Sequence, residues 1–254
     1  MEVEVPVKIH GILDFVVLES KVPLDLVDEL NQEIDTLSEE TDNFSDRLVG
    51  QIKNGCQLHI DKSRCETFKK LYSAAESYGI LYADKFRGAE KALTSAARDN
   101  EFVQAVCYEA WSVNSFSGDY NPIHDHGCMV PAVTGLSFVL WTKIPENMRN
   151  LSAESMKSAS GMLDGCINFV NGPMSQIGEH EFRPSKVLSV SPQVGKFVIF
   201  PHWLNHLVYP FSCEGERRSI SGNVGLFVKD QIDSVPGVSE DEMKDLLKHQ
   251  SQNT

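Results

Sequence analysis

Apolar residues recur at helical spacing in two stretches of the first hundred residues. In the first stretch Leu26, Leu30 and Ile34 repeat at every fourth position, and Pro23 stands where proline commonly opens a helix. The second stretch, from about Cys65 to Lys85, carries aromatic and aliphatic residues along one face at 3.6-residue spacing. These patterns predict two amphipathic helices in the N-terminal part of the chain.

Beyond about Gln104 the period changes to that of β-strands. Short apolar segments alternate with turns of Gly, Pro, Asn and Asp, and no convincing crossover helix separates one segment from the next. This pattern is typical of an antiparallel sandwich or barrel such as a jelly roll, and not of a parallel sheet with crossover helices. The expected strands are Ala105–Phe116, Val133–Ile144, Gly165–Val170, Val187–Val190, Lys196–Phe200, Leu207–Phe211 and Arg217–Val228.

The change of period predicts three regions. Residues 1–103 form a helical region that packs on the barrel, and residues 104–230 form the mainly β core. Residues 231–254 contain a short capped helix over Met243–His249, preceded by Ser239 and acidic residues, and a tail.

Composition and charge narrow the class of partner. The chain has 254 residues with 23 Lys and Arg against 36 Asp and Glu, a formal net charge of −13. An acidic protein lacks the clustered cations that bind nucleic acid or an anionic membrane surface, so neither partner is expected. No apolar run approaches the roughly 20 residues that span a bilayer, and the acidic start of the chain does not resemble a secretory signal. We therefore expect a cytoplasmic protein whose six cysteines, which lack close ligand spacing, are thiols.

Three of the eight histidines stand in patterns that suit a metal site. His124 and His126 lie in the segment Asn-Pro-Ile-His-Asp-His-Gly, and alternate residues of a strand point to the same face. His206 follows 80 residues later and would supply a third ligand from another strand, leaving coordination positions open for substrates. The pair taken alone is more often a pair of surface or hydrogen-bonded histidines than a metal site.

A second pattern, in the segment Gly215–Val224, adds an anion-binding residue. On a regular strand Arg217, Ser219, Ser221 and Asn223 share one face, and Arg218 lies on the other. An inward arginine followed two residues later by a serine can bind a carboxylate through both guanidinium nitrogens and a hydroxyl. The structural alternative is an arginine paired with an acidic residue of the protein itself.

In this order, the paired histidines, the distal histidine in Phe-Pro-His-Trp-Leu-Asn-His-Leu-Val-Tyr-Pro and the segment Gly-Glu-Arg-Arg-Ser-Ile-Ser-Gly-Asn resemble the Fe(II)/2-oxoglutarate-dependent oxygenases. The likeness is greatest to an uncharacterised branch found in marine bacteria and their phages. It spans roughly Tyr108–Val228 and includes the strand that begins Leu136-Ser137.

The resemblance implies a double-stranded β-helix that holds Fe(II), with 2-oxoglutarate chelating the metal. His124 then matches the first metal ligand, His206 the distal ligand, Arg217 the residue that binds the 5-carboxylate of 2-oxoglutarate, and Ser219 its helper. The expected reaction is a dioxygenation, with hydroxylation of a small-molecule or peptide substrate by O2 and release of succinate and CO2. Two residues shortly before the histidine pair, Asn114 and Tyr120, are weaker candidates for binding the cosubstrate.

The chain departs from the commonest pattern of this superfamily at one ligand, because position 126 is His where most members have Asp or Glu. The sequence leaves three alternatives for this ligand position. Either His126 itself binds the metal, or Asp125 turns towards the metal if the strand ends there, or water or an anion fills the position. Strand alternation favours His126, and Asp125 would then be free to orient a histidine.

Two other functions remain open from the sequence. A cupin-type metalloenzyme with three histidines would not use 2-oxoglutarate and would have no need of an inward Arg217. A jelly-roll binding or structural module would carry the histidines incidentally, because a fold does not determine a function.

Overall fold

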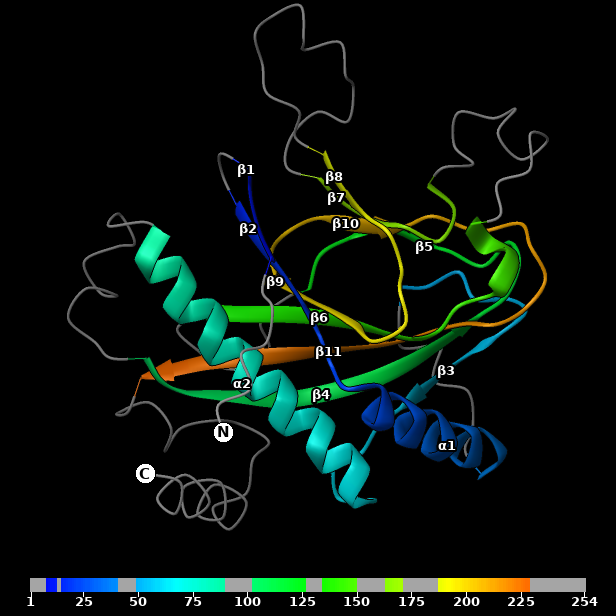
Figure 1. The fold of residues 1–254 in the computed structure, drawn as a ribbon, viewed down its shortest axis with the longest axis horizontal. Helices are drawn as coiled ribbons and strands as arrows, with labels where there is room; N and C mark the ends of the chain where they lie inside the picture. The colour runs from blue at the N-terminus through cyan, green and yellow to red at the C-terminus, as the bar shows by residue number, and fades with distance from the viewer. Residues whose placement is uncertain are drawn as a thin grey trace, which may run out of the picture.

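The computed structural model describes residues 8–12, 15–40, 49–89, 102–126, 134–149, 163–170 and 187–228. Within these ranges the chain forms two antiparallel β-sheets, two α-helices and one short 3-10 helix (Figure 1). The helices are α1 (Leu24–Glu40) and α2 (Glu66–Ala89), and the 3-10 helix is η2 (Glu146–Arg149).

The larger sheet has seven strands in the order β1-β2-β9-β6-β11-β4-β3. Its strands are β1 (Lys8–Ile12), β2 (Phe15–Lys21), β3 (Cys56–His59), β4 (Phe102–Ser115), β6 (Thr134–Lys143), β9 (Lys196–Pro201) and β11 (Arg217–Val228). The smaller sheet has the order β5-β10-β7-β8 and consists of β5 (Asn121–His124), β7 (Ile167–Val170), β8 (Val187–Val190) and β10 (His206–Val208). All the pairs are antiparallel, as the absence of crossover helices from this region predicts.

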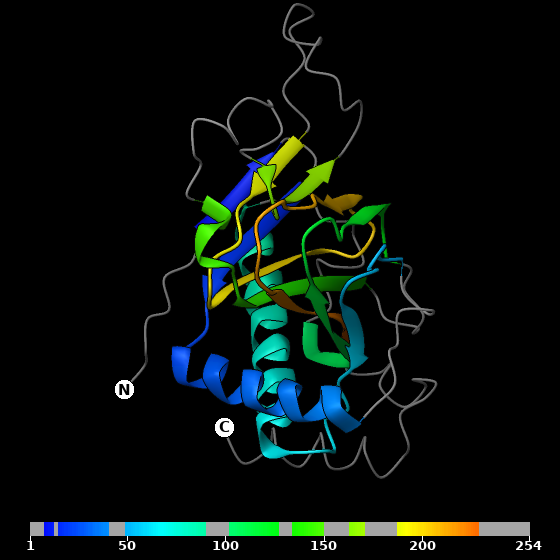
Figure 2. The same ribbon diagram turned by 90° about the vertical axis from the view of Figure 1, so that its right-hand side faces the viewer.

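The elements are arranged in three layers. Helix α2 packs on β4, β9 and β11, and α1 packs on α2, β3 and β6, so both helices cover the larger sheet (Figures 1 and 2). The smaller sheet lies on the other side of the larger one, as the two views show. This arrangement is the jelly roll of the double-stranded β-helix class.

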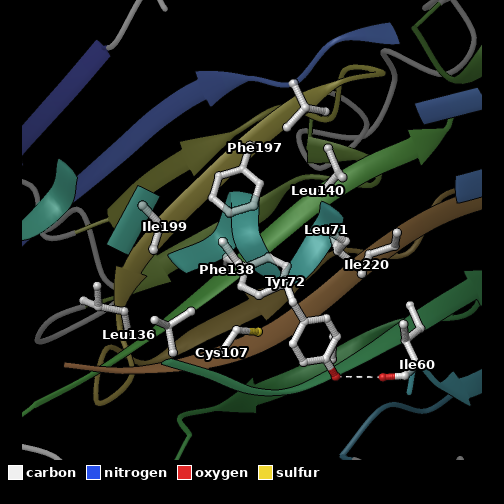
Figure 3. Packing of buried hydrophobic residues seen from close by; sticks show 14 of the residues in the cluster. Ile60, Leu71, Tyr72, Cys107, Leu136, Phe138, Leu140, Phe197, Ile199 and Ile220 are labelled. Atoms are coloured by element: carbon white, nitrogen blue, oxygen red, sulfur yellow. Dashed lines mark hydrogen bonds between the residues drawn. The ribbon is translucent and has the colours of Figure 1, made fainter. Parts of the chain in front are cut away.

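Alternation along the central strands divides the interior into two cores. On β9, Phe197 and Ile199 pack towards the helices, and Val198 and Phe200 pack in the core between the sheets. Figure 3 shows the helix-side core, where residues of the larger sheet meet α2 and the hydroxyl of Tyr72 donates to the carbonyl of Ile60 at 2.7 Å. Because the larger sheet is buried on both faces, its strands β6 and β9 are apolar in successive positions, from Phe138 to Trp141 and from Phe197 to Phe200.

The structure confirms the two predicted helices and the strands expected after residue 104, with ends that differ by a few residues. The first hundred residues are not only helical, however, because β1, β2 and β3 lie in this region and belong to the larger sheet. The sheet therefore crosses the boundary predicted at residue 103. The helix predicted over Met243–His249 lies outside the described residues.

In the described part of the chain no helix is long and apolar enough to cross a membrane.

Candidate metal centre and cosubstrate site

Three histidines converge where the smaller sheet faces the larger one. His124 ends β5 and His206 begins β10, and the two residues are paired in register. His126 lies two residues beyond the end of β5, where its backbone N–H donates to the carbonyl of His202 at 2.8 Å. One nitrogen from each of the three rings lies within 4.8 Å of the other two.

The hydrogen bonds of two of these rings determine which nitrogen is free. Nδ1 of His124 lies 2.7 Å from the carbonyl oxygen of Pro122, and Nδ1 of His206 lies 2.9 Å from that of Leu204. A carbonyl oxygen only accepts, so each Nδ1 carries the proton and each Nε2 keeps a lone pair.

The third ring has a side-chain partner. Nδ1 of His126 lies 2.8 Å from Oδ1 of Asn223, which also accepts from the hydroxyl of Ser137 at 2.7 Å. The amide nitrogen of Asn223 donates to Glu109 at 2.6 Å. His126 also stacks against the indole of Trp111, with a ring separation of 5.7 Å.

Burial keeps the three imidazoles neutral. Desolvation lowers the pKa of His124, lowers that of His126 to about 4, and lowers that of His206 well below its ordinary value. A neutral imidazole with a free Nε2 is the form that binds a transition metal. The cluster therefore offers three nitrogen donors to one metal ion.

The histidines line an open cavity between the sheets. Its space, counted out to the mouth and including open solvent, is about 480 Å³. The cavity is lined by Trp111, Val113, Asn121, His124, His126, Phe138, Val139, Ile167, Phe200, His206, Val208, Arg217, Ser219 and Ser221.

Arg217 brings a positive charge to this cavity. The residue is 4% exposed, its Nη1 donates to the hydroxyl of Ser115 at 3.3 Å, and its Nε has no partner. Burial lowers the pKa of the guanidinium to about 10, so it remains charged at neutral pH. Among the described residues no carboxylate pairs with Arg217, and a buried unpaired charge is costly unless a ligand compensates it.

Arg218 lies on the opposite face, as the alternation along β11 predicts. Its guanidinium donates to Asp35 of α1 at 2.6 Å, to Glu216 at 2.7 Å and to the carbonyl of Asn31 at 3.1 Å. Ser219 and Ser221 line the cavity together with Arg217. The structure thus assigns the two neighbouring arginines to different surroundings.

Two residues suggested for cosubstrate binding are not brought to the cavity. Asn114 lies between Val113 and Ser115, which face the cavity and Arg217, so strand alternation directs Asn114 to the other face. Tyr120 is 41% exposed, outside the cavity lining, and its backbone pairs with that of Gln51.

The structure adds residues that sequence reasoning missed. Ser115 accepts from Arg217 and donates to its backbone carbonyl at 3.0 Å, and Glu109 and Ser137 bond Asn223. The sequence contains one partial indication of these residues, because strand alternation places Asn223 on the same face of the strand as Arg217. The partners of Asn223 depend on the pairing of β11 with β4 and β6, which has no local signature.

Comparisons with known proteins agree with this geometry. Residues 109–223 match the model of a family described as putative 2OG-Fe(II) oxygenase. The matched segment, 115 of the 254 residues, carries the three histidines and Arg217. The protein is a 2-oxoglutarate-dependent oxygenase, with Fe(II) as its metal and 2-oxoglutarate as its cosubstrate.

Solved structures resemble this oxygenase in fold. The 2-oxoglutarate-dependent epimerase SnoN from nogalamycin biosynthesis has a TM-score of 0.51 and 14% identity, over 89% of this chain and 87% of SnoN. A prolyl-4-hydroxylase from Pseudomonas putida has a TM-score of 0.49 and 17% identity, over 82% of this chain and 91% of the hydroxylase. A search of curated protein sequences gives no match.

The residues present fit both groups. One nitrogen from each of the three histidines lies within 4.8 Å of the other two, and Arg217 lines the same cavity, so a metal and an anion can be held side by side.

Proposed function

We propose that this oxygenase is a hydroxylase in which His124, His126 and His206 hold Fe(II) and Arg217 binds the 5-carboxylate of 2-oxoglutarate. Ser219, next to Arg217 on the cavity face of β11, adds a hydroxyl donor to the same carboxylate. The reaction consumes a C–H bond of the substrate, O2 and 2-oxoglutarate, and yields the alcohol, succinate and CO2.

The observation that carries this proposal is the buried Arg217. Its charge lacks an acidic partner among the described residues, and it lines the cavity that holds the three histidines. In a cupin-type enzyme without 2-oxoglutarate, or in a binding module, no ligand carboxylate would offset the free-energy cost of burying this unpaired cation.

The choice of His126 over Asp125 as the third ligand rests on geometry. Strand β5 ends at His124, so strict alternation does not extend to position 126. The ring of His126 nevertheless lies 5.1 Å from that of His206, centre to centre, and its Nδ1 is already bonded to Asn223. Its remaining nitrogen is therefore directed at the other two histidines, whereas Asp125 is not in the cluster of described residues suited to a metal.

The protein groups position the reactants and exclude water. Fe(II), when bound, supplies the activation of O2 that amino-acid side chains cannot provide. Trp111, Phe200 and Ile167 line the cavity beside the polar residues and restrict the access of water.

Anaerobic reconstitution tests the proposal. The protein is loaded with Fe(II), supplied with 2-oxoglutarate and then with O2, and assayed for succinate with and without panels of amino acids, peptides and small metabolites. We expect slow succinate formation alone, faster formation with a substrate, and a product heavier by one oxygen atom. A rearranged or epimerised product without added oxygen would exclude the hydroxylase, and absence of succinate under all conditions would exclude 2-oxoglutarate as the cosubstrate.

A further inference from the structure

The hydrogen bonds behind His126 differ in kind from those behind the other two histidines. Backbone carbonyls, which cannot reorient independently, accept from His124 and His206. His126 instead faces the side-chain amide of Asn223, which can present either an oxygen or a nitrogen. Its tautomer therefore depends on the orientation of an amide.

The carboxylate of Glu109 determines that orientation. An ionised carboxylate only accepts hydrogen bonds, and Oε1 of Glu109 lies 2.6 Å from the amide nitrogen of Asn223. If the amide were turned around, its oxygen would face the carboxylate at the same short distance, and two acceptors would repel. The NH2 group must therefore face Glu109, and Oδ1 must face His126.

With Oδ1 towards His126, the ring has to donate from Nδ1, and Nε2 is left with the lone pair that a metal needs. Ser137 donates to the same Oδ1 at 2.7 Å and holds it in place. Asn223 and Ser137 are 4% and 1% exposed, so water does not compete freely for these bonds.

We propose that Glu109 is a positioning residue that acts through the amide of Asn223 to hold His126 as an Nε2 metal ligand. Glu109, Asn223 and Ser137 are called here the Asn223 network. The inference rests on the proposed role of His126 as a metal ligand, and it adds which residue determines the tautomer of His126. The network also places a negative charge behind the one histidine that stands where most of the superfamily has a carboxylate ligand.

The decisive variant is Glu109→Gln, which has nearly the same volume as the wild type but can donate as well as accept. The amide of Asn223 then loses its fixed polarity, and His126 can take the tautomer with the proton on Nε2. In the metal-free protein at pH 7.5, ring-nitrogen NMR of His126 should report Nδ1–H in the wild type and a mixture of tautomers in Glu109→Gln. Anaerobic titration should show Fe(II) affinity lowered about 10- to 100-fold, as for other residues that orient a metal ligand.

Exchanging the two groups provides a rescue that a packing effect would not show. In Glu109→Gln/Asn223→Asp the carboxylate is at position 223, next to His126, and the amide is at position 109. Because the carboxylate only accepts, His126 must again donate from Nδ1. We expect the double variant to recover Nδ1–H and an affinity within about threefold of the wild type. The single variant Asn223→Asp also requires Nδ1–H, because a carboxylate only accepts, but it sets two carboxylates against each other, so the rescue is judged on the double variant alone.

Glu216→Gln is the matched control, because Glu216 pairs with Arg218 on the other face of β11. It should leave the tautomer and the affinity unchanged. An unchanged tautomer and affinity in Glu109→Gln, or an affinity that the double variant fails to restore, would overturn the inference. If the wild type binds no Fe(II), the proposed function fails, and the NMR of the metal-free variants alone decides whether Glu109 determines the tautomer.

Discussion

At the scale of single residues, the two neighbouring arginines of β11 differ in whether they have an acidic partner within the protein. Arg217 is charged, buried and without an acidic partner among the described residues, whereas Arg218 beside it is bonded to Asp35 and Glu216. The guanidinium of Arg217 can therefore pair with an anionic ligand, whereas that of Arg218 is already paired within the protein.

This difference predicts opposite outcomes for two alanine variants. Arg217→Ala should weaken 2-oxoglutarate binding to the Fe(II)-loaded protein and leave Fe(II) affinity unchanged, because in the proposed role the guanidinium binds the cosubstrate and not the metal. Loss of a buried charged pair costs roughly 2–5 kcal/mol, about 30-fold to several thousand-fold in Kd. Anaerobic titration of 2-oxoglutarate measures it, with Arg218→Ala as the control. An effect in Arg218→Ala alone would mean that the roles are exchanged.

A second pair of variants tests the third ligand. His126→Ala should lower Fe(II) affinity strongly, because one of three converging nitrogens is lost, and Asp125→Ala should lower it little. Titration of both variants with Fe(II) under anaerobic conditions decides between them. Tolerance of His126→Ala combined with loss in Asp125→Ala would place a carboxylate in the site.

The residues of the site were predictable as far as local alternation reaches. The spacing within Arg217–Asn223 places Arg217 and Ser219 on one face, because a strand has a period of two. It does not reveal that Glu109 lies opposite Asn223, a pairing set by the register of β11 on β4 across an irregularity after Asn223. Ser115 was missed for the same reason.

At the scale of elements, the amphipathic helices were predictable and the N-terminal strands were not. Helix α1 buries Val27, Leu30 and Ile34 at helical spacing, a signal that survives without tertiary information. In β2, by contrast, Val17 packs in the core between the sheets and Leu18 in the helix-side core. A strand buried on both faces has no alternating pattern and resembles a short apolar run of any kind.

The contact between α2 and β4 should make stability depend on pH. Burial raises the pKa of the Glu76 carboxyl to about 7, although its Oε1 accepts from the N–H of Cys107 and Lys62 attracts it. Because the unfolded chain releases this proton near pH 4.5, the folded state binds more protons between about pH 4.5 and 7. The contribution of Glu76 to the free energy of unfolding therefore falls as the pH rises through that window.

Glu76→Gln keeps the acceptor for Cys107 and removes the charge. It should match the wild type near pH 4.5 and exceed it in free energy of unfolding by about 1–3 kcal/mol at pH 8, as urea titrations at the two values would measure. Glu66→Gln, at an exposed position of the same helix, is the control. A difference between wild type and Glu76→Gln that does not vary with pH would contradict the prediction.

Arg218 ties α1 to the larger sheet. Its side chain is 3% exposed and reaches Asp35 and the carbonyl of Asn31 on the helix. Arg218→Ala should lower the free energy of unfolding by about 1–3 kcal/mol, because Asp35, Glu216 and the half-buried carbonyl of Asn31 each lose a hydrogen bond from the buried guanidinium. Hydrogen exchange should rise in α1 more than in α2, and equal protection of both helices in the variant and the wild type would argue against this tether.

At the scale of the whole molecule, the jelly roll was predictable because most of its strands, β4 to β11, lie in one continuous β region without crossover helices. Strands β5 and β10, which carry His124 and His206, pair with each other, and β10 also pairs with β7, so the two histidines lie on neighbouring strands of the smaller sheet. A ligand bound by residues of these strands should therefore raise the free energy of unfolding of the whole domain.

This linkage gives the last prediction. A metal that binds only the folded protein adds RT ln(1 + [L]/Kd), about 2.7 kcal/mol at 100 times Kd. For a protein of this size the gain corresponds to an increase in Tm of about 5–10 °C. Mn(II), which is stable in air, should produce this increase in the wild type by scanning calorimetry. His206→Ala should show none relative to its own metal-free Tm, although its absolute Tm also falls because His206 packs against Phe200 with ring centres 4.9 Å apart. A full increase in His206→Ala would show that the metal binds elsewhere.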